Sequence, residues 1–553
     1  MRDTAQNKLI ELQHNPSSIR NICIMAHVDH GKTTLADSLV ASNGVISQKM
    51  VGKLRYMDSR RDEQQRGITM KSSSIALYHC KNESEYLINV IDCPGHVDFF
   101  SEVSTALRLC DGAIIIVDVV EGVCPQTQAC LKQIWSENIK PILVLNKIDR
   151  LILEFKLTPL DAYIHLLKCS NKEAETKRGV GVQSGEDLYN QWSTAIEAAD
   201  DSDLYVSPNQ GNVVFASAAD GWAFRNRLKF SVKQNLGVNV DVLKKTLWGD
   251  FYLHSKTKRI MKGAQEKAKK PIFVQMILEN IWLIYDVIIN QKDKERLSKI
   301  AESMNVTLFA RDLRQTDTRI LLQSFLSQWI PLSLSVLGMV CDKCPSPNQL
   351  TDVKIENLLC PPMKEFNLMP KETIALKTVF SKCSPDDASV PVIAFVSKMF
   401  PIKRKYLPQN KPKVLTAEEI AKRRELARIK HALKSSAIKT EDSETKCSIT
   451  VNNEENKPEV IEPTQNENDV MFIAFGRMYS GTIRRGQEIY VLGPKHDPSK
   501  ITDSDFYVDE KCTLATLKSD QHIMKTIITD LYMLMGRDLE PVDEVPAGNI
   551  WCG

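Results

Sequence analysis

Hydrophobic and polar residues alternate in blocks over the first 220 or so residues. A short run rich in β-branched residues begins at Asn21, and a loop and an amphipathic stretch follow it. Similar runs recur at residues 86–91, 113–117, 142–145 and 213–215. Strands that alternate with helices predict an α/β fold with a mostly parallel, doubly wound sheet. Because ligands of such sheets bind at the carboxyl ends of the strands, we expect the functional residues in the loops that follow these runs.

The pattern changes after residue 235. Residues 236–350 predict a helical or α+β subdomain that continues the sheet domain, and the uncharged stretch 320–341 predicts two buried helices that meet at Pro331 rather than a membrane span. Residues 351–553 predict a β-barrel. Its alternating runs are 391–400, 471–475 and 487–492, with Gly481 and Gly486 between the last two.

Two charged segments interrupt these regions. Residues 170–203 lose periodicity and predict a surface insertion in the sheet domain. Residues 403–469 are basic as far as Lys434 and acidic afterwards, and Thr416-Ala-Glu-Glu419 predicts a capping box that opens a basic helix. A solvated helix with a disordered acidic tail is one interpretation of this low-complexity segment. A nucleic-acid or ribosome contact is the other, because clustered basic charge releases counterions from phosphates.

Composition narrows the class of protein. At 553 residues, with 43% hydrophobic and 25% charged residues, the chain predicts a soluble protein of two to four domains, and we expect a monomer with no membrane partner. The net charge of +3 neither requires nor excludes a nucleic-acid partner. The 14 cysteines are scattered and no signal peptide precedes them, which predicts a cytoplasmic protein. Cys341 and Cys344 form a CxxC pair without the second pair that a zinc site needs.

The first loop carries a phosphate-binding motif, a P-loop. It opens an amphipathic helix, and its amides and the helix amino terminus are suited to hold phosphates. We expect Lys32 to reach the β- and γ-phosphates and the Thr33 hydroxyl to ligate Mg²⁺. Alone, the motif leaves open an ordinary turn, since Ala26 replaces the first consensus glycine. The predicted nucleotide-binding residues of this loop are Ala26, His27, Val28, Asp29, His30, Gly31, Lys32, Thr33 and Thr34.

The next motifs predict a hydrolysis site. Asp92-Cys-Pro-Gly95 ends a hydrophobic run, so Asp92 is expected to hold Mg²⁺ through water and the Gly95 amide to contact the γ-phosphate. His96 is expected to orient the attacking water, although a helix-entry histidine packed on a neighbour is an alternative. Arg66-Gly-Ile-Thr69 predicts a switch loop whose Thr69 ligates Mg²⁺ only when the γ-phosphate is present. The predicted catalytic residues are His96, Lys32, Thr69 and Gly95.

The last motifs select the base. Asn146-Lys147-Ile-Asp149 follows a strand, and the Asp149 carboxylate can accept hydrogen bonds from the ring N–H and amino group of guanine. Adenine would leave this carboxylate unpaired, at a cost of about 1–3 kcal/mol. Ser217-Ala218 fits the loop whose backbone completes base recognition. The set predicts a GTP- and GDP-binding hydrolase, that is, a GTPase with Mg²⁺ as cofactor.

These motifs resemble those of the elongation factor 2 / elongation factor G group of translational GTPases. The resemblance covers nearly the whole chain apart from the two insertions. Within the group, Gly52-Lys-Leu-Arg-Tyr-Met-Asp-Ser59 and Gly67-Ile-Thr-Met-Lys-Ser72 are more similar to the elongation factor-like GTPases of cytoplasmic 60S ribosomal subunit maturation. Outside the nucleotide motifs the resemblance rests on Leu247-Trp-Gly-Asp250, Pro345-Ser-Pro347, Met535-Gly-Arg537 and Val545-Pro-Ala-Gly-Asn549.

This resemblance implies a function and partners. It implies a GTPase stimulated by the large ribosomal subunit, through its RNA and GTPase-centre proteins, that works with the Shwachman-syndrome protein to release initiation factor six. It also implies a monovalent cation near Asp29. Members of the group continue into three further domains, so ending at Gly553 predicts a truncated chain with an incomplete barrel. Translocation of the elongation factor 2 type, and a nucleotide-dependent ribosome-binding module, are the alternative functions.

Overall fold

The computed structural model describes residues 2–179, 206–225, 240–254, 259–314, 317–360, 366–385, 390–410, 470–497 and 522–553. The chain divides into two compact units, one formed by Met1–Lys398 with Ala474–Gly553 and the other by Met399–Ile473. Most of the second charged segment, including the basic helix expected from Thr416, lies outside the described residues. In the first charged segment, residues 170–179 belong to helix α7 (Pro159–Gly179), and residues 180–203 lie outside the described residues.

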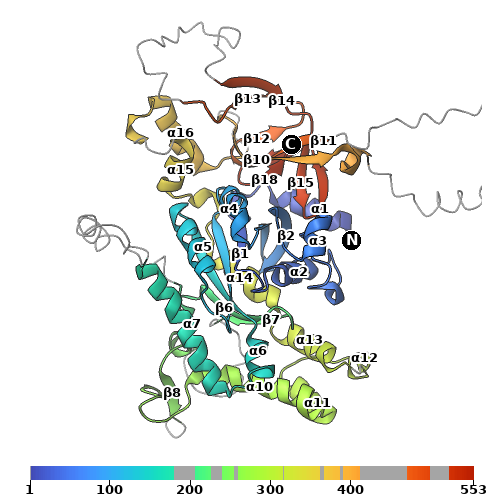
Figure 1. The fold of residues 1–553 in the computed structure, drawn as a ribbon, viewed down its shortest axis with the longest axis vertical. Helices are drawn as coiled ribbons and strands as arrows, with labels where there is room; N and C mark the ends of the chain where they lie inside the picture. Colours follow the sequence, from blue (N-terminus) through green and yellow to red (C-terminus); the bar gives the residue numbers. More distant parts are fainter. Residues whose placement is uncertain are drawn as a thin grey trace, which may run out of the picture. The chain divides into compact units, whose positions relative to one another are not determined.

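A seven-stranded sheet forms the centre of the first unit (Figure 1). Strand β1 pairs in parallel with β3 and β4, and β4–β5 and β5–β6 are parallel pairs as well. The predicted doubly wound α/β fold is therefore confirmed. In spatial order the strands are β2 (Ser73–Lys81), β3 (Ser84–Asp92), β1 (Ile19–Ala26), β4 (Gly112–Asp118), β5 (Lys140–Asn146), β6 (Val213–Ser217) and β7 (Trp222–Arg225).

The two edge strands are antiparallel and were not predicted. Strand β2 is joined to β3 by Asn82 and Glu83, which both have positive φ, 47° and 67°. This two-residue turn lacks the Asn-Gly signature that marks such hairpins in a sequence. Strand β7 returns beside β6 after only a few residues. Strand β7 has only four residues, which leaves little periodicity to detect.

Helices cover both faces of the sheet. Alternate residues of β1, namely Ile22, Ile24 and Ala26, belong to one buried cluster with residues of α2 and α14. Helix α5 contacts β1, β4 and β5, and in Figure 1 it lies on the opposite side from α2. The helices of this part are α1 (Arg2–Leu12), α2 (Lys32–Ser42), α3 (Arg61–Arg66), α4 (Phe100–Leu107), α5 (Pro125–Ser136), α6 (Ile148–Leu153) and α7.

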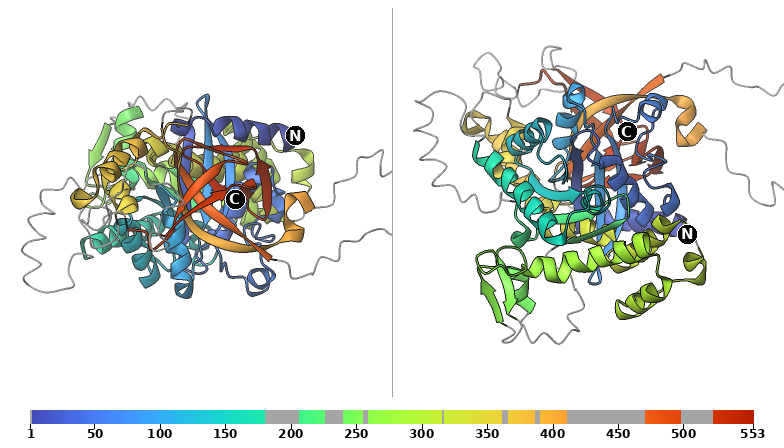
Figure 2. Two further views of the ribbon diagram at one scale, coloured as in Figure 1. Left: turned by 90° about the horizontal axis from the view of Figure 1, so that it is seen from above. Right: turned by 60° about the horizontal axis from the view of Figure 1, so that its bottom comes forward.

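The region after the sheet is largely helical, with one small hairpin of β8 (Phe251–His254) and β9 (Arg259–Lys262). Segments η6 (Val274–Leu278), α10 (Glu279–Tyr285) and η7 (Asp286–Gln291) follow one another without a break, and the right view of Figure 2 shows them as one long helix. The remaining helices are α9 (Val240–Thr246), α11 (Lys294–Ser303), α12 (Ala310–Leu313), α13 (Thr318–Trp329) and α14 (Leu332–Lys343).

Pro331 separates α13 from α14 and is the N-cap residue of α14, as the sequence predicted. Proline fixes the extended conformation of the cap and cannot continue the preceding helix. Helix α14 packs on β5, β6 and β7, and Cys341 and Cys344 lie in the buried cluster there. Within the described residues, no helix has both the length and the apolar character needed to cross a membrane.

Two helices, α15 (Asp352–Leu359) and α16 (Lys371–Lys382), occupy the beginning of the range that was expected to form the barrel. The strands begin only at β10 (Ile393–Lys403). One sheet has the order β10-β11-β18-β15-β16, and two further pairs are β12–β17 and β13–β14. The bounds are β11 (Val470–Ser480), β12 (Thr482–Arg484), β13 (Glu488–Leu492), β14 (Ile523–Ile527), β15 (Leu531–Met535), β16 (Asp538–Val542), β17 (Glu544–Pro546) and β18 (Ile550–Cys552).

A buried ion cluster joins these strands to the central sheet. Both terminal guanidinium nitrogens of Arg477, on β11, donate to the carboxylate of Asp111 at 2.8 Å. The Lys354 ammonium lies 3.2 Å from the same carboxylate, and all three side chains are buried. Removing one partner of such a pair typically costs about 3–5 kcal/mol, because the other charge stays buried and unpaired. The cluster therefore holds the barrel strands against the loop before β4.

Candidate nucleotide-binding site

The P-loop lies between the end of β1 at Ala26 and the start of α2 at Lys32. Gly31 has φ of 96°, and a Cβ atom on it would collide with the side-chain amide of Asn146, so only glycine fits there. Asp29 also has positive φ, at 62°. No side chain caps the first turn of α2, which contains Lys32, Thr33 and Thr34. The backbone amides of this turn are thus left for a ligand with negative charge.

Lys32 connects the predicted phosphate-side residues to one another. Its ammonium donates to Oδ1 of Asp92 at 2.7 Å and to Oγ1 of Thr69 at 2.9 Å, and all three side chains are buried. Burial raises the pKa of Asp92 to about 6, and the Lys32 charge opposes this rise. The second oxygen of Asp92, Oδ2, is buried and has no hydrogen-bond partner among the described residues. A buried carboxylate oxygen in this position fits a metal-bound water.

A second carboxylate, which the sequence did not single out, completes this cluster. Thr69 Oγ1 donates to Oδ1 of Asp58 at 2.8 Å, and Arg55 Nε donates to Oδ2 of Asp58 at 2.7 Å. Asp37 on α2 accepts hydrogen bonds from the amides of residues 52, 55 and 56 at 2.8–3.1 Å. The segment 52–58 is therefore fixed to the helix that begins at the P-loop.

The barrel strands hold the same segment from the other side. Arg537, after β15, donates to the carbonyl oxygens of residues 54, 55 and 56 at 2.9–3.0 Å. The Tyr56 hydroxyl donates to the Met535 carbonyl at 3.2 Å, and a Cβ atom on Gly536 would press on the Tyr56 ring. A continuous chain of contacts thus runs from Arg537 through Asp58 and Thr69 to Lys32.

Gly95 and His96 follow β3 but differ in their surroundings. A Cβ atom on Gly95 would lie 3.1 Å from the Ala26 carbonyl, so glycine permits the close approach of this loop to the P-loop. His96 is exposed over 40% of its side chain, and its Nδ1 accepts from the amide of Asp98 at 3.3 Å. In this conformation His96 caps the short helix η3 (Val97–Phe99). No contact joins it to the Lys32 cluster among the residues that the structure describes.

The base-side motifs lie together at the ends of β5 and β6. Asn146 donates to the His30 carbonyl at 2.9 Å and accepts from the Ala218 amide at 2.9 Å, so its side chain links the P-loop to the loop after β6. Ser217 Oγ donates to Oδ1 of the buried Asp149 at 2.7 Å. Burial and the neighbouring Asp220 raise the pKa of Asp149.

The predicted Lys147 has a carboxylate partner that was not predicted. Lys147 and Arg150 both lie within 2.9 Å of Oδ2 of the buried Asp118 at the end of β4. Arg319 on α13 lies 3.6 Å from Asp149 and donates to Asp220 at 3.0 Å. Arg319 comes from a helix 170 positions after Asp149 (319 − 149), so no local spacing signals this pair.

The structure thus brings the predicted residues together in two groups. Lys32, Thr69 and Asp92 contact one another, with Thr33 next to Lys32 in the first turn of α2. Asn146, Asp149, Ser217 and Ala218 form the second group.

Comparison with known proteins decides the family. The elongation factor Tu GTP binding domain matches residues 17–247, and elongation factor Tu domain 2 matches residues 472–553. Residues 17–247 and 472–553 are therefore domains of the elongation factor Tu family. In this GTPase, the domain match contains both groups of site residues, and guanine-nucleotide binding follows from the family.

The GTPase is also similar to longer proteins. It is 48% identical over 580 aligned residues to Elongation factor-like GTPase 1 of Homo sapiens, covering 98% of this chain and 51% of that protein. It is 39% identical to Ribosome assembly protein 1 of Saccharomyces cerevisiae, covering 98% of this chain and 57% of that protein. The chain spans about half the length of the curated relatives it matches.

Proposed function

We propose that this GTPase hydrolyses GTP in response to the ribosome, during late maturation of the large (60S) ribosomal subunit in the cytoplasm. The main observation behind this proposal is that the phosphate-side group and the base-side group of predicted residues both contact the P-loop. Asn146, from the base-side group, donates to the His30 carbonyl of the P-loop. Lys32, two residues after His30, donates to Thr69 and Asp92 of the phosphate-side group. A ligand that spans both groups has a base at one end and phosphates at the other.

On the phosphate side, Lys32 exchanges Asp92 and Thr69 for the β- and γ-phosphates, and the amides of α2 and Gly95 complete the cradle. Thr33, Thr69 and Asp92 are the residues that would hold Mg²⁺, with Asp92 acting through a water. When bound, this ion neutralises charge on the phosphate oxygens. The unpartnered Oδ2 of Asp92 supports this assignment.

On the base side, Asp149 accepts from the ring N–H and amino group of guanine, while Asn146, Lys147, Ser217 and Ala218 shape the pocket. The hydrogen bond from Ser217 keeps the Asp149 carboxylate in one orientation. Residues 26–30 form the P-loop backbone ahead of Gly31. Asp29, with its positive φ, stays the proposed neighbour of a monovalent cation on the strength of the resemblance.

His96 orients the attacking water once the ribosome has moved it from its cap on η3. Its 40% exposure and the local character of its contacts with Asp98 and the Phe99 ring support this role, because little packing has to be broken to move it. Hydrolysis by the free protein is therefore slow. Large-subunit RNA and GTPase-centre proteins supply the stimulating contact.

The assignment to subunit maturation rests on the relatives, which are named Elongation factor-like GTPase 1 and Ribosome assembly protein 1. The proposed role with the Shwachman-syndrome protein in releasing initiation factor six rests on the sequence resemblance alone.

Co-sedimentation with ribosomal particles tests the proposal. The chain is mixed with immature 60S particles that carry initiation factor six, or with mature ribosomes, in the presence of a non-hydrolysable GTP analogue, GDP or an ATP analogue. We expect GTP-analogue-dependent binding to the immature particles. Preferential binding to mature ribosomes would instead favour the translocation function, and binding without any nucleotide preference would contradict a GTPase cycle.

A further inference from the structure

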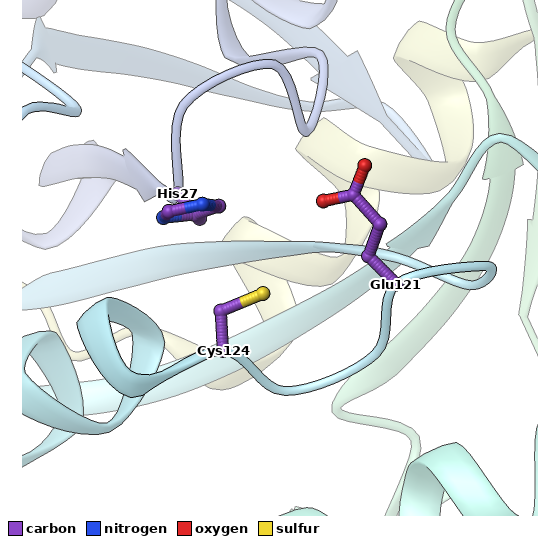
Figure 3. Close-up of side chains that lie close together, drawn as sticks. All are labelled: His27, Glu121 and Cys124. Carbon is purple, nitrogen blue, oxygen red and sulfur yellow. The ribbon is translucent and has the colours of Figure 1, made fainter.

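A second cluster of metal-binding side chains lies beside the P-loop. Within the described parts of the chain, one group of three His, Cys, Asp or Glu residues has all of its ligand atoms within 4.8 Å of one another: His27, Glu121 and Cys124. His27 comes from the P-loop, and the other two come from the loop between β4 and α5. Figure 3 shows the three side chains turned toward a common space.

The distances between these three ligand atoms are close to those of a zinc site. Zinc–ligand bonds of about 2.0–2.3 Å place neighbouring ligands of a tetrahedral ion about 3.3–3.6 Å apart. Ligand atoms that already lie within 4.8 Å of one another have to approach by only about 1 Å to reach this spacing.

Only His27 is engaged in a way that suits metal binding. His27 Nδ1 lies 2.7 Å from the side-chain oxygen of Gln126. Histidine ligands usually donate their other ring N–H to such an oxygen, which orients the ring and leaves a lone pair on Nε2. His30 Nδ1 instead accepts from the Asp118 amide at 3.2 Å, so its ring proton is on Nε2, which lies 3.2 Å from Oε2 of Glu121.

A capping role does not account for the cysteine. Cys124 is the N-cap residue of α5, yet its side chain makes no capping bond, and cysteine is not among the favoured capping residues. Glu121 is exposed and His27 and Cys124 are half-buried, so an ion can reach the cluster from solvent.

We propose that His27, Glu121 and Cys124 form a binding site for a thiophilic divalent cation, Zn²⁺, distinct from the Mg²⁺ site, with water as the fourth ligand. Imidazole and thiolate donors select zinc over magnesium, which prefers oxygen ligands. Binding releases the Cys124 thiol proton to solvent. The ion would tie the P-loop to the loop before α5 and thereby slow the release of bound GDP.

Cobalt(II) is the probe for this site, since it gives a sulfur-to-metal charge-transfer band and strong visible bands when bound tetrahedrally with a thiolate. Nucleotide-free protein, first treated with a chelator, is titrated with Co²⁺ and then with Zn²⁺. We expect saturation at one equivalent and displacement by Zn²⁺. Cys124→Ser should abolish the charge-transfer band. Glu121→Gln should weaken Co²⁺ binding about tenfold or more, because it removes the negative charge of one ligand.

Cys80→Ser is the matched control, because Cys80 is the exposed free cysteine of β2 and lies outside the cluster. Its spectrum should equal that of the wild type. A charge-transfer band that survives Cys124→Ser, or that disappears equally in Cys80→Ser, would overturn the proposal, as would the absence of any such band. The titration needs no nucleotide, so its outcome is independent of whether the proposed GTPase function holds.

Coupling to the nucleotide has a separate measurement. Release of a fluorescent GDP is followed with and without one equivalent of Zn²⁺. Wild-type release should slow about tenfold, within the usual range of coupling between two sites. Cys124→Ser should remove this effect, and an equal effect of Zn²⁺ on both proteins would contradict the coupling.

Discussion

The phosphate half and the base half of the nucleotide site differ in how their polar groups are paired. In the phosphate half, Lys32 is bonded to Asp92 and Thr69, which are themselves groups proposed to serve the ligand. In the base half, Asn146 and Ser217 bond to the neighbouring loops and to Asp149, and these bonds are compatible with a bound base. The base half is thus preformed, whereas the phosphate half has to exchange internal bonds for ligand bonds. Preformed groups lower the ordering cost of binding.

This difference separates recognition from control. Guanine can be selected by groups that hardly move. The phosphate half, in contrast, is connected through Thr69 and Asp58 to the segment 52–58 and from there to Arg537 after β15. A displacement of Thr69 at the phosphates can therefore be transmitted through these contacts to the barrel strands.

The largest effect is expected for Lys32→Ala. It removes the positive charge that is proposed to bind the β- and γ-phosphates, and each such charge-assisted hydrogen bond contributes about 1.5–3 kcal/mol. The affinity for GTP should fall by about 100-fold or more, since 1.4 kcal/mol corresponds to a factor of ten. Titration with a fluorescent GTP analogue measures this. Lys53→Ala, an exposed lysine of the adjacent segment, should bind normally; unchanged binding by Lys32→Ala would contradict the assignment.

A smaller effect is expected for Asp149→Asn. The amide presents a donor to the donors of guanine, so the affinities for GTP and GDP should fall together, by about 10- to 100-fold or 1–3 kcal/mol. Weak ATP binding should not become weaker. Competition titrations with all three nucleotides provide the measurement, and Asp161→Asn on α7 is the control. If GTP and GDP were affected to different degrees, the separation into two halves would be wrong.

The smallest effect is expected for Arg537→Ala. It removes three hydrogen bonds to exposed carbonyl groups, which water can replace, so global stability should change by about 1 kcal/mol or less. Hydrogen exchange should nevertheless become faster in residues 52–58. Arg485→Ala, which removes another exposed barrel arginine with a backbone contact, should leave this segment protected. Equal exchange in both variants would disprove the link from the barrel.

The parallel strands and the motifs in the loops that follow them could be predicted from the sequence, because each depends on residues that are close together in the chain. A hydrophobic run followed by a Gly-Lys-Thr or Asn-Lys-x-Asp motif fixes both a strand and the residues at its end. Asp118 and Asp220 were missed because each lies outside a motif, and groups that pair with them come from other segments of the chain. Asp58 lies in the segment 52–59 that carries the resemblance, but its contact with Thr69 is not visible in the sequence. Arg319 and Arg537 were missed for the same reason, since only the folded chain brings them to the site.

The most direct test of the central claim is GTP turnover with and without large ribosomal subunits, measured for the wild type and for His96→Ala. We expect slow turnover by the free wild type, strong stimulation by the subunits, and a loss of about 10²- to 10⁴-fold of the stimulated rate in His96→Ala. GTP affinity should be equal in the two proteins. No stimulation of the wild type, or full stimulation of His96→Ala, would contradict the account.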